Sequence, residues 1–214
     1  MGQAKNKNMQ KKAQPKKPLW PWLTAAGACV AVLAGVLIWA LTSGGDSAES
    51  GKHHVAITVR DYGTITVELD ADAAPITVQN FLDLADSGFY DGLTFHRIME
   101  GFMIQGGDPE GTGMGGSDKT IKGEFSANGV ENSLSHTRGA ISMARSSAMD
   151  SASSQFFIVQ KDSTFLDGQY ACFGYVTDGM DVVDAIAADA QPTDDNGTIP
   201  ADQQPVIESV KVLD

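Results

Sequence analysis

One arginine lies among apolar and amide side chains in the segment FHRIMEGFMIQGGD, residues 95–108. Arg97, Phe102, Met103 and Gln105 fall within nine positions, on two strand-like runs that Gly101 interrupts. Side chains alternate along a regular strand, so Met103 and Gln105 are predicted to share a face. Such a face could hold a small apolar group next to a guanidinium. The spacing alone fits an ordinary pair of half-buried strands at least as well.

Other chemistries lack the residues that they need. The segment GTGMGG at 111–116 satisfies G-x-G-x-x-G, but no helix opening follows it, so a surface loop is predicted rather than a dinucleotide site. The segment 194–197 is interpreted as a turn, because Pro192 stands where a calcium loop needs its first ligand. The four histidines show no metal-ligand spacing, and Cys172 lies in an apolar run typical of a buried thiol. We expect neither a metal nor a cofactor.

The elements that must position these residues are mostly strands. Val55–Val59 and Ile65–Leu69 alternate on either side of a turn with Gly63, which predicts a β-hairpin. Helical spacing begins at Pro75 and ends before Gly88, and a second short helix is predicted at Met180–Ala188. Further strand-like runs are Leu93–Met99, Phe102–Gln105, Ala140–Ala144, Phe156–Val159, Ala171–Val176 and Val206–Leu213. Many strands with only two helices predict a mainly β protein with a closed or sandwiched antiparallel sheet.

Charge is unevenly distributed along the 214 residues. The formal net charge is −12, yet six of the 15 Lys and Arg residues and none of the 27 acidic residues lie in positions 1–18. The rest of the chain therefore holds nine basic residues against 27 acidic ones, a balance of −18. Such an acidic body would repel a phosphate backbone, so we expect no binding of nucleic acid.

An uncharged, mainly apolar segment of 23 residues, 19–41, follows the basic arm. It is long enough to span a bilayer as a helix, and Trp20, Trp22 and Trp39 lie near its ends. We expect an uncleaved, single-pass anchor in the cell membrane with the lysines inside and the C-terminal body outside the cytoplasm. A cleaved signal peptide, which would make the protein secreted, is the alternative. Residues 42–52 are small and polar and are interpreted as a flexible linker to a domain at 53–214.

Residues 55–214 resemble the cyclophilin family of peptidyl-prolyl cis-trans isomerases, in the shorter form typical of bacteria. The resemblance rests on FHRIMEGFMIQGGD, GTGMGG, KGEF, ISMAR, SSQFFIV and FLDGQYACFGYVTDGMDVVDAI, in this order. It implies an eight-stranded antiparallel barrel closed at its ends by two helices.

The resemblance also implies a site. By this resemblance the catalytic residues are Arg97, Phe102 and Gln105, and Arg97 matches the catalytic arginine of the family. The positions that match substrate-binding residues are Met103, Ala144, Arg145, Gln155, Phe157, Phe165, Leu166 and Tyr170. Three of them differ from the best-known eukaryotic pattern: Phe165 replaces a tryptophan, Tyr170 a histidine and Arg145 an asparagine. The first change removes an indole N–H that helps to bind cyclosporin, so we expect weakened affinity for that inhibitor.

The function that this resemblance implies is isomerisation of X-Pro bonds in exported polypeptides, without a covalent step. Arg97 would stabilise the twisted amide, in which the nitrogen regains a lone pair. A surface ion pair between Arg97 and Glu100 or Glu124 is the structural alternative for this residue. A proline-peptide-binding chaperone with little turnover is the alternative function. The expected partners are unfolded or partly folded polypeptides, and the expected state is a monomer.

Overall fold

The computed structural model describes residues 50–214. The predicted basic arm at 1–18, the anchor at 19–41 and most of the linker lie outside these residues. Within the described range, no helix combines the length and the hydropathy needed to cross a membrane. The last two positions of the predicted linker belong to the folded part, because Lys52 begins the first strand and the Gly51 N–H donates to Asp72 Oδ1 at 2.9 Å.

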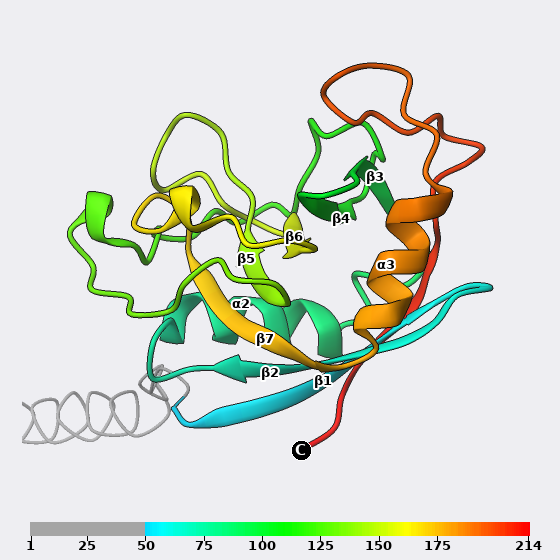
Figure 1. Ribbon diagram of the computed structural model, residues 1–214. Helices are drawn as coiled ribbons and strands as arrows, with labels where there is room; N and C mark the ends of the chain where they lie inside the picture. The colour runs from blue at the N-terminus through cyan, green and yellow to red at the C-terminus, as the bar shows by residue number, and fades with distance from the viewer. Residues whose placement is uncertain (1–49) are drawn as a thin grey trace, which may run out of the picture. The chain divides into compact units, whose positions relative to one another are not determined.

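Within residues 50–214, eight strands and two α-helices follow one another (Figure 1). Their bounds are β1 Lys52–Val59, β2 Gly63–Asp70, α2 Pro75–Asp86, β3 Thr94–Met99, β4 Met103–Asp108, β5 Ala140–Met143, β6 Phe156–Val159, β7 Cys172–Asp178, α3 Met180–Asp189 and β8 Ile207–Val212. Two 3-10 turns, η1 Ser126–Asn128 and η2 Thr164–Leu166, were not predicted. The hairpin, both helices and the six further strands match the sequence prediction to within about three residues.

The strands form one antiparallel sheet in the order β3-β4-β6-β5-β7-β2-β1-β8. Its edge strands β3 and β8 meet through an isolated bridge between Thr94 and Val206. Two backbone bonds beside this bridge, Phe95 N–H to Pro205 O at 3.0 Å and Ile207 N–H to Leu93 O at 2.8 Å, complete the contact. The described sheet is therefore a curled half-barrel, and the closed barrel that the resemblance implies is not completed by a continuous strand ladder.

The two faces of the central strands serve different purposes. On one face Ile104, Ile141, Phe156 and Ile158 are buried in the main core. This core also takes the inward residues of β1 and β2 and the apolar stripes of α2 and α3. Strand alternation sends Met103, Ala140, Phe157 and Val159 to the other face, where they form a second, smaller apolar cluster. Phe102, Leu166 and Tyr170 pack against this second cluster and are only partly buried themselves, so an apolar surface remains open to ligands.

Candidate active site

A β-bulge in β3 turns Arg97 toward this open face. Phe95 pairs with Gly106 and Arg97 pairs with Gln105, so His96 is an extra residue on β3. A bulge of this kind re-aims the side chains around it. Phe95 and Ile98 are consequently both buried in the main core, while His96 and Arg97 line a cleft of about 470 Å³ on the opposite side. We name this space the prolyl cleft, after the ligand that the family resemblance implies for it.

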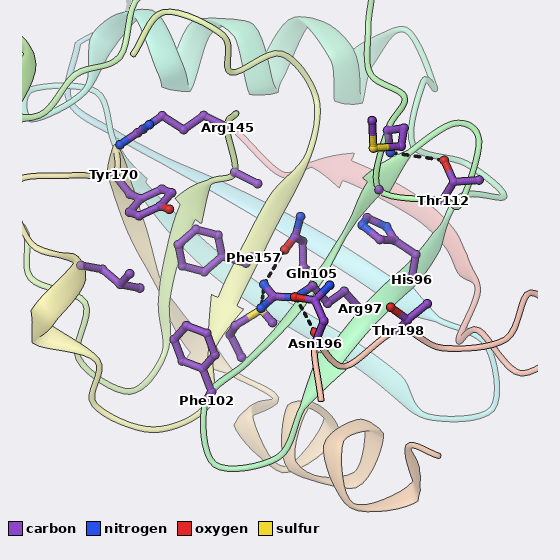
Figure 2. A pocket seen from close by; sticks show the side chains of 15 residues that line it. His96, Arg97, Phe102, Gln105, Thr112, Arg145, Phe157, Tyr170, Asn196 and Thr198 are labelled. Carbon is purple, nitrogen blue, oxygen red and sulfur yellow. Dashed lines mark hydrogen bonds between the residues drawn. The ribbon is translucent and has the colours of Figure 1, made fainter. Parts of the chain in front are cut away.

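The guanidinium of Arg97 is fixed by hydrogen bonds from two directions (Figure 2). Its Nε donates to the carbonyl oxygen of Asn196 at 2.7 Å, and its Nη1 donates to Gln105 Oε1 at 3.1 Å. Its Nη2 lies 3.2 Å from Met99 Sδ. Burial lowers the pKa of Arg97 from its ordinary value, but a guanidinium remains charged at neutral pH.

Arg97 has no carboxylate partner among the described residues, so the expected structural alternative is wrong. Neither Glu100 nor Glu124 forms an ion pair with it. Glu124 is buried at the start of α2, where it accepts hydrogen bonds from the backbone of Ile76 and Thr77. The charge of Asp194 acts on Arg97 without forming an ion pair, so the guanidinium is not neutralised by direct contact and can act on a ligand in the cleft.

Two glutamine amides connect this arginine to the glycine-rich loop at 111–116. Gln105 Nε2 donates to Gln155 Oε1 at 2.9 Å. Gln155 Nε2 in turn donates to the carbonyl oxygens of Gly113 and Gly115, at 3.1 and 2.7 Å. Asp108 holds the loop in place, because its carboxylate accepts hydrogen bonds from the backbone N–H groups of Glu110, Thr112 and Gly113. Burial opposes ionisation of Asp108, but these N–H donors prevail and lower its pKa.

The structure brings together most of the residues that the sequence proposed. Those that line the prolyl cleft are Arg97, Phe102, Met103, Gln105, Ala144, Arg145, Phe157, Leu166 and Tyr170. Gln155 lines an adjoining cleft of about 340 Å³, which we name the side cleft. Phe165 lines neither cleft: its side chain is 65% exposed, and its ring lies 5.7 Å from that of Phe102.

Sequence reasoning missed several residues of the prolyl cleft. Thr112, Gly113 and Met114 come from the glycine-rich loop, and Asn196 and Thr198 come from the predicted turn at 194–197 and the residue after it. Asp194 stabilises this turn by accepting from Thr198 N at 3.0 Å. The only signal for these residues was their turn composition, which does not say where in space a turn lies.

His96 is the other residue that was missed. Its side chain is buried, and neither ring nitrogen has a hydrogen-bond partner among the described residues. Burial lowers the pKa of His96; the nearby Asp108 acts in the opposite direction, and the charge of Arg97 adds to the lowering. The imidazole is therefore held in its neutral form beside the guanidinium.

Comparison with known proteins identifies the family of this chain. The family model described as cyclophilin type peptidyl-prolyl cis-trans isomerase/CLD matches residues 54–212. Peptidyl-prolyl cis-trans isomerase B of Bacillus subtilis is 48% identical over 123 residues, which cover 58% of this chain and 82% of that protein. The isomerase-like 1 protein of Rhizopus delemar is 47% identical over 121 residues, 56% of this chain and 72% of that protein. Because bacterial and fungal relatives are about equally similar, the comparisons do not single out a bacterial form.

A solved structure shares the fold as well. The crystal structure of a cyclophilin-type isomerase from Cryptosporidium parvum, obtained in the presence of the dipeptide Ala-Pro, superposes with a TM-score of 0.66 at 31% identity. The match covers 75% of this chain and 99% of that one. With a family model that spans residues 54–212, this chain belongs to the cyclophilin-type peptidyl-prolyl cis-trans isomerases.

Proposed function

We propose that this isomerase acts on X-Pro bonds of exported polypeptides and that Arg97 is its catalytic residue. The observation that carries the proposal is the position of the Arg97 guanidinium, which borders the apolar side chains of Met103 and Phe157 and forms no ion pair within residues 50–214. An apolar wall next to a fixed cation suits a pyrrolidine ring attached to an amide. The similar Cryptosporidium parvum enzyme was crystallised with Ala-Pro, which contains such a bond.

The chemistry follows from the electronic structure of the amide. Resonance gives the C–N bond partial double-bond character and a rotation barrier of about 18–20 kcal/mol. In the twisted transition state the nitrogen becomes pyramidal and regains its lone pair. Oxygen acceptors engage the Nε–H and one N–H of Nη1 of Arg97, and Met99 Sδ accepts from Nη2 at 3.2 Å. The second N–H of Nη2 can donate to that lone pair. Because the planar nitrogen is a poor acceptor, this interaction stabilises the transition state more than the ground state.

The second glutamine and the apolar side chains have supporting roles in this proposal. Phe102, Met103, Phe157 and Leu166 hold the pyrrolidine ring, while Gln105 orients Arg97. Gln155, Ala144, Arg145 and Tyr170 border the path of the polypeptide on either side of the proline. Phe165 extends this surface toward solvent beside Phe102.

The location of the substrate is also part of the proposal. The basic arm at 1–18 and the uncharged segment at 19–41 support an anchored protein whose isomerase domain lies outside the cytoplasmic membrane. Its partners are then unfolded or partly folded chains that have crossed the membrane. We propose that it acts as a monomer.

The test is the rate of cis-trans isomerisation of an X-Pro peptide by the full chain in a protease-coupled assay. We expect Arg97→Ala to lower kcat/KM at least about tenfold, equivalent to about 1.4 kcal/mol of transition-state stabilisation. Arg97→Lys should restore little, because an ammonium cannot reproduce the planar fork. Arg60→Ala removes the same charge from an ion pair with Glu208 and should keep the wild-type rate.

Circular dichroism and the melting temperature must show that each variant is folded. Wild-type turnover in folded Arg97→Ala would mean that Arg97 is not catalytic. Tight peptide binding by the wild type without any rate enhancement would instead identify a chaperone with little turnover.

A further inference from the structure

The two clefts lack negative charge although the chain is acidic. The sequence holds 27 Asp and Glu residues against 15 Lys and Arg residues. Among the described residues that line the prolyl cleft and the side cleft there is no carboxylate, whereas Arg97 and Arg145 both line the prolyl cleft. Clefts lined by charge of one sign concentrate the field and attract ligands of opposite charge. The distribution therefore favours an acidic group near the prolyl bond.

Arg145 is held rigidly at the border of both clefts. Its guanidinium lies 4.8 Å from the ring centroid of Tyr170 and 5.1 Å from that of Phe125. Nε and Nη2 donate to the carbonyl oxygen of Gln169 at 3.0 and 2.8 Å, and Nη1 donates to Ser146 O at 2.8 Å. Aromatic faces and carbonyl oxygens stabilise the cation but do not neutralise it. Figure 2 shows Arg145 beside Tyr170, on the wall away from His96 and Thr112.

The acidic residues nearest to Arg145 in sequence and in the neighbouring loop are engaged elsewhere. Asp150 accepts hydrogen bonds from the backbone N–H of Gly123 and from Asn128 Nδ2. Asp167, two residues before Gln169, accepts hydrogen bonds from Ser135 Oγ at 2.6 Å and from the backbone N–H of His136 at 2.7 Å. Arg145 forms no ion pair within residues 50–214. It is a fixed, half-buried cation with donors still available.

We infer that Arg145 is a specificity-determining residue that selects polypeptides with an aspartate or glutamate next to the prolyl bond. The inference rests on the proposed isomerase function, because Arg145 borders the cleft in which Arg97 acts. The carboxylate would accept hydrogen bonds from the free guanidinium N–H groups at the Tyr170 side of the cleft. Partly exposed ion pairs contribute about 0.2–1 kcal/mol, so we expect a preference of about threefold. Arg145 already has its orientation fixed, so forming the pair costs little side-chain entropy.

The experiment compares matched peptides that differ only in charge. Exchange NMR measures kcat/KM of the full chain for peptides with an acetyl group at the N-terminus and an amide at the C-terminus. Each peptide carries either Glu or Gln at one of four positions: the two residues before proline and the two residues after it. The caps remove terminal charges that would mimic the effect. In low salt we expect kcat/KM for Glu to exceed that for Gln about threefold at one or more positions. High salt should reduce this ratio toward one.

Variants assign the preference to Arg145. In Arg145→Gln the Glu/Gln ratio should fall to about one, whatever happens to the absolute rates. Arg60→Gln changes the net charge equally, outside the two clefts, and should keep the wild-type ratio. If Arg145→Gln does not fold, the wild type still provides a test: the ratio must disappear as the peptide glutamate is protonated near its pKa of about 4.3, with the Gln peptide as the reference.

Three results would overturn the inference. One is a Glu/Gln ratio of one at all four positions in a wild type that accelerates the Gln peptides, which leaves the isomerase function intact. Another is a ratio unchanged in folded Arg145→Gln. If no peptide is accelerated, the isomerase function fails by itself. Dissociation constants of the same peptides, measured by titration calorimetry, then decide the inference, and equal values for Glu and Gln would reject it.

Discussion

The buried imidazole of His96 makes the stability of this protein depend on pH. Burial lowers its pKa, and burial also lowers the pKa of His136, which Asp167 opposes in part. The unfolded chain has ordinary histidines with a pKa of about 6.5, so it binds more protons than the native state below that pH. The contribution of the two buried histidines to the free energy of unfolding is therefore complete above about pH 6.5. It decreases as the pH falls toward their lowered pKa values in the native state.

We expect His96→Phe to reduce this pH dependence. The measurement is the free energy of unfolding in urea at about pH 7.5 and 5.5, where one buried histidine can contribute up to about 1.4 kcal/mol per pH unit. The carboxylates with lowered pKa, such as Asp108, lose their contribution only near and below pH 4 and do not interfere. His54, whose side chain is 44% exposed, is the control, and His54→Phe should not reduce the difference. An unchanged difference in His96→Phe would contradict the assignment.

Phe165 allows a test of inhibitor recognition that leaves the prolyl cleft intact. Its ring is exposed and tilted against Phe102, so a larger indole can be accommodated from solvent. We expect Phe165→Trp to strengthen cyclosporin binding by restoring an indole N–H donor, with little effect on turnover of a short peptide. Titration calorimetry gives the dissociation constant, and Phe165→Leu, which adds no donor, is the control. Equal affinity of wild type and Phe165→Trp would show that the missing donor is not what limits binding.

At the scale of residues, the sequence identified the strand face that carries the site, but not the distant residues that complete the site. Met103 and Gln105 share the cleft as alternation predicts, and both contact the Arg97 guanidinium. The carbonyl oxygen of Asn196, 99 residues away, could not be predicted because backbone contacts at that separation leave no local pattern. The bulge at His96 was equally hidden, since regular alternation would place Arg97 on the same face as Phe95.

At the scale of elements, the N-terminus of α2 depends on a residue from a distant loop. Ala74 stands at the N-cap and provides no side-chain hydrogen bond. Glu124 takes its place: Oε1 accepts from Ile76 N at 3.0 Å, and Oε2 accepts from Thr77 N at 2.8 Å and Thr77 Oγ1 at 2.7 Å. The Glu124 side chain is buried and forms no ion pair within the described part of the chain, so the positive end of the helix dipole is what stabilises a negative charge there.

We expect Glu124→Ala to lower the free energy of unfolding by about 2–3 kcal/mol, because it leaves buried N–H donors without an acceptor. Glu124→Gln keeps one oxygen and should lose less. The exposed Glu131 is the control, and Glu131→Ala should stay within about 0.5 kcal/mol of the wild type in urea denaturation. If Glu124→Ala is no less stable than Glu131→Ala, the capping role of Glu124 is wrong.

Element types were easier to predict than their edges and closure. The hairpin of β1 and β2 pairs Val55 with Val67 and Ile57 with Ile65, as the alternating pattern indicates. Pro75 begins α2, and α3 begins at Met180. The turns η1 and η2 lack a periodic signal, and the half-barrel closure depends on a bridge between Thr94 and Val206 that no local pattern records.

At the scale of the whole molecule, charge is unevenly distributed in two ways. The N-terminal residues are basic and the rest of the chain is acidic, and within the folded part that the structure describes the two clefts lack the carboxylates that are common elsewhere. The six lysines at positions 1–18 precede an acidic remainder. Within that remainder, the two clefts contain arginine and no carboxylate among the described residues. An acidic body repels anionic surfaces in general, so an acidic polypeptide would be attracted only close to the clefts. The acidic surface keeps the domain soluble, while the two clefts attract acidic polypeptides.

The same segregation predicts the topology that the proposed anchor would give the protein. Lysines next to a long uncharged segment stay on the cytoplasmic side. Six lysines precede residues 19–41 and only Lys52 follows closely, so the isomerase domain should face outward. Protease added to intact cells or protoplasts should therefore digest or release the C-terminal domain while a cytoplasmic marker survives. Protection of the domain until the membrane is opened would reverse the orientation. A mature N-terminus after Leu41, found by mass spectrometry, would show that the segment is a cleaved signal peptide, because an anchor must keep its apolar residues in the bilayer to hold the domain at the membrane.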